Sequence, residues 1–288
     1  MTRPVRRLLR LRHARSRIRP SKTLLVSCAL GVVLLVAALI PDLLAPYGPT
    51  DIFAGASLQG PDGTHVFGTD RIGRDILSRL IYGSRTSLGI AIPSVMSALA
   101  MGLLIGLVVG YAGGWTDRIV MRLLDILFAF PAILLALALV AVLGPGPLNL
   151  IITIAILYMP RFAVICRAAA LNLRASEFVE AAQSVGGSPL HIMRRHVLPN
   201  MMPLVIVETT LSMSAAILTE AALSFLGLGI QPPTPSWGAM LSDAQTYMTI
   251  APWTIVFPGL AIMVAVLVLN LLGDSLRDRL DPRLRRLQ

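Results

Sequence analysis

The sequence predicts an all-α integral membrane protein with six transmembrane helices. Of its 288 residues, 55% are hydrophobic and 14% are charged, and the mean hydropathy is +0.75. Soluble globular proteins carry about 25% charged residues, and a soluble chain this apolar would expose surfaces that aggregate. The long uncharged runs leave room for about six segments of roughly 20 residues, the length with which a helix spans a bilayer.

Composition also bears on what the protein binds. The net charge of +10 comes from basic residues that gather at the ends of the apolar runs. They are not interleaved with aromatic residues as in a nucleic-acid groove, so we expect a lipid bilayer and no nucleic acid as partner. Cys28 and Cys166 lie in or beside apolar runs, far apart and without a CxxC pattern. We therefore expect neither a disulfide framework nor a metal site.

The N-terminal part predicts one membrane helix after a basic tail. Residues 1–22 contain eight Arg, one Lys and no acidic residue, which predicts a basic cytoplasmic tail. The next run, residues 23–40, is uncharged over 18 residues. It is longer than the core of a usual signal peptide and lacks a clear cleavage site, so we interpret it as a retained first transmembrane helix.

The first helix and the following loop form a predicted unit over residues 23–85. Residues 41–85 are polar and rich in Pro and Gly, which predicts an extracytoplasmic loop. Within it, apolar residues recur at helical spacing and charged residues take the other side, which predicts an amphipathic helix on the bilayer interface. Its apolar side has Ile72, Ile76, Leu77, Leu80 and Ile81, and its other side has Arg74, Asp75 and Arg79.

Residues 86–274 are expected to form a core of five further helices. The spans are expected within the uncharged runs 86–116, 126–160 (divided in two by Gly144–Pro147), 201–226 and 244–273, with a loop from 227 to about 249 before the last span. In the first run, Gly102, Gly106 and Gly110 recur every four residues. Such a stripe lets another helix approach closely, and the sequence leaves open whether that helix belongs to the same chain or to a partner. A basic cytoplasmic tail follows at 275–288.

The polar stretch Glu177–Asn200 separates two apolar runs and predicts two short helices. Gly186–Gly187 divides them, because glycine reaches left-handed backbone angles without penalty. Ser188 and Pro189 are typical of the N-cap and first position of a new helix, and Leu198–Pro199 is expected to end it. A helix–Gly–helix projection of this kind between membrane helices needs a partner to dock into.

The charge distribution predicts the orientation in the membrane. Residues 1–22, 112–122, 161–200 and 274–288 hold 9, 2, 5 and 5 Lys or Arg residues, against four in the predicted outer loops. Cytoplasmic loops carry the excess of Lys and Arg. We therefore predict a multi-pass protein of a bacterial cytoplasmic membrane, with both termini and the Glu177–Asn200 stretch in the cytoplasm.

Glu180, Ala181, Ala182 and Gly186, followed by His196-Val-Leu198-Pro199, resemble the coupling-helix motif of type I ABC importer permeases. The stretch from Gly68 to Arg85 resembles the signature of dipeptide/oligopeptide C-type permease subunits of the peptide/nickel transporter family. The resemblance implies the six-helix permease fold and assigns ATPase coupling to the motif residues. It also implies a homologous B-type permease subunit, two cytoplasmic ABC ATPase subunits and an extracytoplasmic substrate-binding protein as partners.

No enzymatic role is expected for the chain itself. The phosphate-binding loop of an ATPase needs G-x-x-x-x-G-K-[ST], whereas the only lysine, Lys22, has no glycine near it. ATP and Mg are therefore expected on the partner ATPases, and no cofactor or catalytic residue in this chain. His191 and His196 are five residues apart, so they are not expected to share a helical face as the zinc ligands of an HExxH helix do.

Three acidic residues fall within predicted membrane helices, where a charge usually has a partner or a function. Asp125 is expected to form an ion pair with Arg122, and Glu208 to face cytoplasmic water or a neighbouring helix. For Glu220 two interpretations stand side by side, a pathway or gating residue and a helix–helix hydrogen bond.

The expected function is the import of di- or oligopeptides through a pathway of which this chain forms half. The same architecture importing nickel, glutathione or opines is the alternative. A secondary transporter or channel is a weaker one, because those proteins usually show inverted repeats with helices broken at the midplane.

Overall fold

The computed structural model describes residues 22–53 and 55–280, and this part of the chain is helical without a β-strand. Only one isolated bridge, between Thr69 and Asp75, joins extended segments there. The predicted basic tails fall mostly outside the described residues. In chain order the helices are α1 (Lys22–Leu39), α2 (Pro41–Leu44), α3 (Ile76–Ala112), α4 (Gly114–Phe128), α5 (Ala132–Leu143), α6 (Pro147–Arg174), α7 (Glu177–Ser184), α8 (Pro189–Ile192), the π-helix η2 (Met193–Val197), α9 (Leu198–Phe225), α10 (Trp237–Ala244), the 3₁₀ helix η3 (Gln245–Tyr247) and α11 (Trp253–Leu280).

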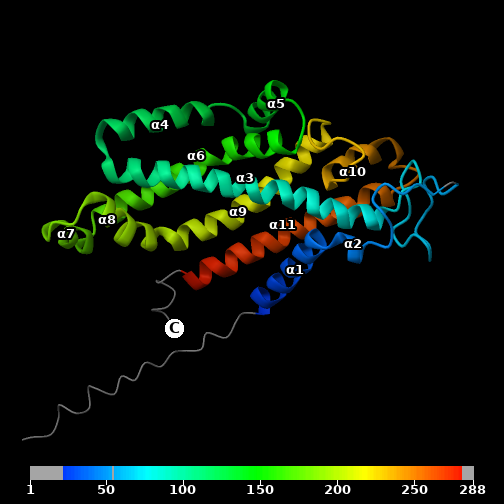
Figure 1. The fold of residues 1–288 in the computed structure, drawn as a ribbon, viewed down its shortest axis with the longest axis horizontal. Coiled ribbons are helices and arrows are strands. Elements are labelled where there is room, and N and C mark those ends of the chain that lie inside the picture. Colours follow the sequence, from blue (N-terminus) through cyan, green and yellow to red (C-terminus); the bar gives the residue numbers. More distant parts are fainter. Residues whose placement is uncertain (1–21, 54, 281–288) are drawn as a thin grey trace, which may run out of the picture.

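The helices agree with six membrane passages. Four are long and apolar enough to cross a bilayer: Ile76–Ala112, Pro147–Arg174, Pro189–Phe225 and Trp253–Arg279. The pair α4 and α5, bent by 90° at a short break, passes the same test together, and α1 is a shorter apolar helix. The long helices lie side by side in an elongated bundle (Figure 1). The all-α fold class is confirmed, with the sixth passage resting on the short helix α1.

No separate amphipathic helix precedes the second span, so that prediction is wrong. α3 runs unbroken from Ile76 to Ala112, and a boundary at residue 85 falls inside it. The side chain of Asp75 caps the helix by accepting a hydrogen bond from Ser78 N. Arg74, Asp75 and Arg79 are buried rather than placed at an interface. The periodic apolar residues correctly predicted a helix. The charged residues on its other side, however, contact other parts of the protein and not water.

The glycine stripe of α3 packs against α6 of the same chain. A Cβ atom added at Gly106 would lie 2.6 Å from Cys166 Cβ and 2.8 Å from Arg167 N, and Gly102 and Gly110 are equally tight against α6. The absence of side chains is therefore what permits the two helices to approach. Of the two alternatives left open by the sequence, the structure shows the intramolecular one.

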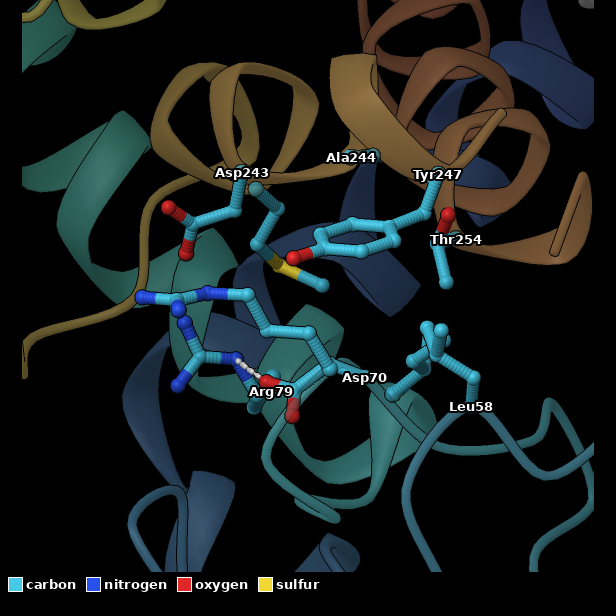
Figure 2. A pocket seen from close by; sticks show the side chains of 10 residues that line it. Leu58, Asp70, Arg79, Asp243, Ala244, Tyr247 and Thr254 are labelled. Carbon is cyan, nitrogen blue, oxygen red and sulfur yellow. Dashed lines mark ion pairs between the residues drawn. The ribbon is translucent and has the colours of Figure 1, made fainter. Parts of the chain in front are cut away.

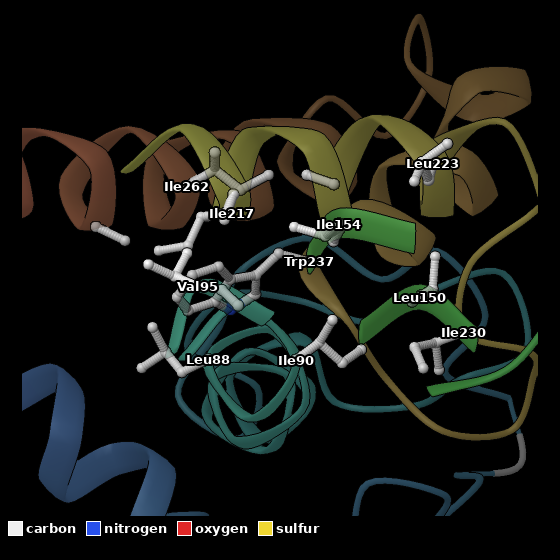
Figure 3. Packing of buried hydrophobic residues seen from close by; sticks show 14 of the residues in the cluster. Leu88, Ile90, Val95, Leu150, Ile154, Ile217, Leu223, Ile230, Trp237 and Ile262 are labelled. Carbon is white, nitrogen blue, oxygen red and sulfur yellow. The ribbon is translucent and has the colours of Figure 1, made fainter. Parts of the chain in front are cut away.

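The loop after α9 folds back into the bundle. Trp237, the first residue of α10, is buried, donates from Nε1 to Leu80 O at 3.1 Å and packs beside Gly83. Figure 3 shows its ring among aliphatic side chains of several helices. The sixth span begins at Trp253, inside the uncharged run 244–273 that was expected to hold it, and α10 and the turn around Tyr247 precede it.

The predicted division of the apolar run 126–160 is confirmed. Gly144 and Gly146 have φ values of 86° and 139°, and Pro147 is in the first turn of α6. A further break, absent from the prediction, separates α4 from α5 at Ala129–Pro131. Proline disfavours helical angles in the residue before it, so α4 cannot run straight into α5.

Candidate functional site

The coupling segment, Glu177–Asn200, is fixed to the bundle by apolar contacts. Val179, Ile192 and Val197 are fully buried. They join a cluster formed with the ends of the long helices, namely Leu107 of α3, Cys166 and Ala170 of α6, and Met201 and Val205 of α9. The segment is thus held at three fully buried positions on its inner side, and most of its other residues are exposed.

The predicted break inside the segment is confirmed. Gly186 has φ +81°, its N–H bonds Gln183 O at 2.9 Å, and Gly187 N bonds Ala182 O at 3.0 Å. These two bonds satisfy carbonyls at the end of α7. At the start of α8, Ser188 Oγ accepts from His191 N at 3.4 Å, as expected of an N-cap.

The second short helix does not end at Leu198–Pro199, which corrects the prediction. It continues through η2 into α9, so that the chain is helical from Pro189 to Phe225. Pro199 lacks the N–H that would bond Arg195 O and would crowd that carbonyl in a regular α-helix. The wider π-turn of η2 relieves this crowding, and Asn200 Nδ2 donates to His196 O at 2.6 Å.

The π-turn also changes the relation of His191 to His196. Residues five apart come together in a π-helix, whose hydrogen bonds run from i to i+5. The two ring centroids lie 6.1 Å apart, so the expectation that these histidines do not share a face is wrong. Within the described part of the chain, no group of three or more His, Cys, Asp or Glu side chains could hold a metal ion.

The motif residues divide between the outer and inner sides of the segment. Glu180, Ala181, Gly186 and Pro199 are exposed, whereas Ala182, His196 and Leu198 are half-buried. The apolar side chains nearest the glycine pair are among the most exposed in the described structure, Val185 at 87% and Leu190 at 70%. Sequence reasoning missed both, although apolar residues beside a glycine pair in a polar loop were a visible signal.

Glu208 lies at the middle of the long Pro189–Phe225 helix and joins it to α6. Its Oε1 forms an ion pair with Arg161 Nε and accepts from Ser212 Oγ at 3.2 Å. Only 9% of the Glu208 side chain is exposed. Of the two expected locations, the contact with a neighbouring helix is the one observed.

The expected ion pair between Asp125 and Arg122 is absent from the structure's described ion pairs. Both side chains are exposed on α4. The nearby pair instead joins Asp117 to Arg167 of α6, with Nη2 and Oδ2 2.6 Å apart. Their closeness along α4 predicted that Asp125 pairs with Arg122. The ion pair observed there is instead made by another acid, Asp117, with an arginine of α6.

Glu220 is completely buried between α9, α3 and α10. Its Oε1 accepts from Ser224 Oγ at 2.7 Å, and Ser87 and Ser236 lie beside the carboxyl group. Its Oε2 has no hydrogen-bond partner within the part of the chain that the structure describes. Since Ser224 belongs to α9 itself, this hydrogen bond joins no second helix, and both interpretations of Glu220 stay predictions.

At the opposite end of the bundle from the coupling segment, buried charges connect the 45–75 loop to α10. Asp70 Oδ2 lies 2.6 Å from Arg74 Nε and 3.6 Å from Arg79 Nε, and Arg74 Nη2 lies 3.7 Å from Asp243 Oδ2. Figure 2 shows Asp70, Arg79 and Asp243 around a small pocket that Tyr247 and Thr254 also line. Its volume of about 20 Å³ is enough for a single water molecule.

The profile of the family described as "Binding-protein-dependent transport system inner membrane component" matches residues 102–286. The chain belongs to this family. It is 43% identical to the dipeptide transport system permease protein DppC of Alkalihalophilus pseudofirmus, over 95% of this chain and 90% of that protein. It is 45% and 46% identical to the glutathione transport system permease proteins GsiD of Pectobacterium atrosepticum and Escherichia coli, over 90% of this chain and 87% and 86% of those proteins.

These comparisons establish the class to which the chain belongs. It is a C-type permease subunit of a peptide-type ABC importer, as the two sequence motifs predicted, and not an enzyme. It is a multi-pass inner-membrane protein, in agreement with its apolar helices. The roles of individual residues in the coupling segment stay predictions.

Proposed function

We propose that this chain forms half of a translocation pathway that imports short peptides across the bacterial cytoplasmic membrane. The observation that carries the proposal is its 43–46% identity, over nine-tenths of its length, to dipeptide and glutathione permeases. Glutathione is itself a tripeptide, so both names denote substrates of one chemistry. A short peptide is therefore favoured over nickel and opines.

In the proposed mechanism, separate ATPases drive the cycle through the coupling segment. Val185 and Leu190 beside Gly186 supply an exposed apolar tip that fits an apolar groove on a cytoplasmic ATPase. Val179, Ile192 and Val197 bind the segment to three long helices, so a displacement of the tip moves their ends. Both chain termini then lie in the cytoplasm, where ATP is, as the distribution of Lys and Arg predicts.

The proposed assembly contains four further polypeptides. A homologous B-type permease completes the pathway, two ABC ATPase subunits bind ATP and Mg, and an extracytoplasmic binding protein delivers the substrate. ATP binding closes the ATPase pair, and the two permeases rock to open outward and receive the peptide. Release of the ATPase pair after hydrolysis opens the pathway inward.

The test measures uptake of labelled dipeptide, tetrapeptide, glutathione and nickel in a strain deleted for this gene. The strain receives either the wild-type gene or the Gly186→Pro variant. Proline is fixed at φ near −65° and cannot adopt the +81° of Gly186. We expect the wild type to restore peptide uptake, and the variant to insert normally in the membrane without restoring it.

Two results would contradict the proposal in different ways. Restoration of nickel uptake alone would keep the importer and overturn the peptide substrate. Normal transport by Gly186→Pro, at matched amounts in the membrane, would overturn the role of the coupling segment.

A further inference from the structure

An open cleft of about 560 Å³ runs along α4 and reaches Arg167 of α6. α4 lies apart from the long helices, and its beginning is at the end of the bundle that carries α7 and α8 (Figure 1). Leu124 is the one residue of α4 that is buried. The cleft is lined by the four charged side chains of the helix, those of Asp117, Arg118, Arg122 and Asp125, together with apolar ones such as Trp115 and Leu123.

The charges in this cleft are not all neutralised. Arg167 is paired with Asp117, and Arg118 stacks over the Trp115 ring with its Cζ 5.1 Å from the ring centroid. Arg122 and Asp125 have no side-chain ion pair or hydrogen bond within the described structure, and both are exposed. They stand three residues apart, which places them on one face of the helix.

Unpaired charges in this position require water or a polar ligand. α4 belongs to the bent pair that together passes as a membrane span. Ionisable side chains in such segments face the bundle interior or a water-filled cavity and mark the paths of substrates.

The two charges match the ends of a short peptide. A free peptide carries one ammonium and one carboxylate group, and in an extended dipeptide these lie up to roughly 7 Å apart. Arg122 and Asp125 are separated by about 4.5 Å along the helix axis, and the long Arg side chain can reach further. A cation or an anion alone would leave one of the two charges without a counterpart.

We propose that Arg122 and Asp125 line the translocation pathway near the coupling segment and bind the carboxylate and the ammonium group of the passing peptide. The proposal rests on the proposed import of peptides. It makes the two residues determinants of specificity for zwitterionic substrates, beyond the selection made by a binding protein.

The first experiment measures ATP-driven uptake by the complete transporter in proteoliposomes, with Arg122→Gln and Asp125→Asn in this chain. Arg118→Gln is the matched control. It removes a charge from the same wall of the cleft, but this charge already has a partner, because Arg118 stacks on Trp115. We expect each variant to lower the rate of dipeptide uptake at least five-fold and the control to change it less than two-fold. Unchanged uptake in both variants would overturn the proposal.

The second experiment measures whether positions 122 and 125 are accessible to water, and it does not depend on peptide transport. Asp125→Cys and Arg122→Cys are made with Cys28→Ser, because Cys28 is exposed and Cys166 is buried. Inside-out vesicles that carry the complete transporter are treated with a charged methanethiosulfonate or an apolar maleimide. We expect the charged reagent to react, and added dipeptide to slow the reaction at least three-fold.

The other outcomes each contradict the proposal. Reaction with the apolar reagent alone would place α4 against lipid, and reaction with neither would place it in a contact between subunits. Reaction with the charged reagent that dipeptide does not slow would leave water in the cleft but no peptide. Labelling in the absence of peptide does not depend on the substrate. If the wild type fails to import peptides, the proposed function fails, and the labelling still shows whether residues 122 and 125 face water.

Discussion

At the end of the bundle with the coupling segment, three apolar side chains hold the backbone in place, those of Val179, Ile192 and Val197. At the opposite end, buried charges such as Arg74 and Asp75 hold a loop that is likewise irregular. The coupling segment leaves its apolar tip, formed by Val185 and Leu190, exposed. The loop at the opposite end satisfies its polar groups internally. This difference supports the proposal that a cytoplasmic ATPase docks at the coupling segment through an apolar contact.

The largest effect is expected from Val179→Asp, because it places an unpaired carboxylate at a fully buried position. Leaving a buried charge without a partner costs about 3–5 kcal/mol, so little folded protein should remain in the membrane. Val185→Asp, the same change six residues later at an 87% exposed position, should leave thermal stability within about 0.5 kcal/mol. It should nevertheless lower ATP-driven uptake at least ten-fold.

Equal loss of thermal stability in these two variants would remove the distinction between the anchored and the free side of the coupling segment. The measurement is the midpoint temperature of unfolding in detergent, with the amount of ATPase co-purified as the second reading.

The second-largest loss of stability is expected at the opposite end of the bundle, from Asp75→Ala. The Asp75 carboxylate contacts His65 Nδ1 at 3.0 Å and accepts from both Ser78 N and Ser78 Oγ at 2.7 Å. Removing it leaves buried donors unsatisfied at the start of α3, a loss of about 3 kcal/mol. The exposed Asp51→Ala is the control, with Gly48 N as its hydrogen-bond partner. Similar midpoint temperatures for the two variants would show that the buried contacts do not stabilise this end.

A smaller loss of stability is expected from a substitution in α3, the helix that joins the two ends. Gly106→Ala forces α3 away from Cys166 and Arg167 of α6, and overpacking of this kind costs about 1–3 kcal/mol. Gly89→Ala is the matched control on the same helix, since an added Cβ meets no atom within 4 Å there. Alanine at position 89 should be neutral or slightly stabilising. A loss at position 89 equal to that at 106 would contradict close packing as the cause.

The smallest effect concerns pH at the loop end. The N–H groups of His65 and Thr64 donate to the Asp62 carboxylate and hold its pKa below the ordinary value of 3.8. A lowered pKa means that the stabilisation is complete above the unfolded-state pKa and is lost as pH falls through the lower, folded-state pKa. Amide-exchange protection of Thr64 and His65 should therefore fall as the pH drops below 3.8. Asp62→Asn should remove this pH dependence, and its persistence in that variant would identify another group.

The sequence was informative where one chain segment determines its own structure. Runs of uncharged residues predicted the long helices, because a bilayer-spanning segment must satisfy its backbone internally. Gly186 and Ser188 predicted the break in the coupling segment, because their backbone and side-chain preferences are local. The glycine stripe predicted a close approach, and only its partner was left open.

It was less informative where distant segments or an unusual helix determine the result. Arg74 and Arg79 were placed on the outside of an amphipathic helix, since periodicity does not reveal that Asp243 of α10 lies beside Arg74. The burial of Trp237 has the same origin, because its partner Leu80 belongs to α3. The spacing rule for α-helices failed at His191 and His196, where η2 changes the hydrogen-bond pattern.

The unbroken helix from Pro189 to Phe225 has a mechanical consequence. Its inner end carries Leu190, its outer end carries Glu220, and Glu208 binds α6 near its midpoint through Arg161. A helix of this length is about 55 Å long, so a tilt of about 10° around the Glu208 contact displaces both ends by roughly 5 Å in opposite directions. A shift of the inner end thus carries the buried carboxyl group of Glu220, at the outer end of the same helix, in the opposite direction.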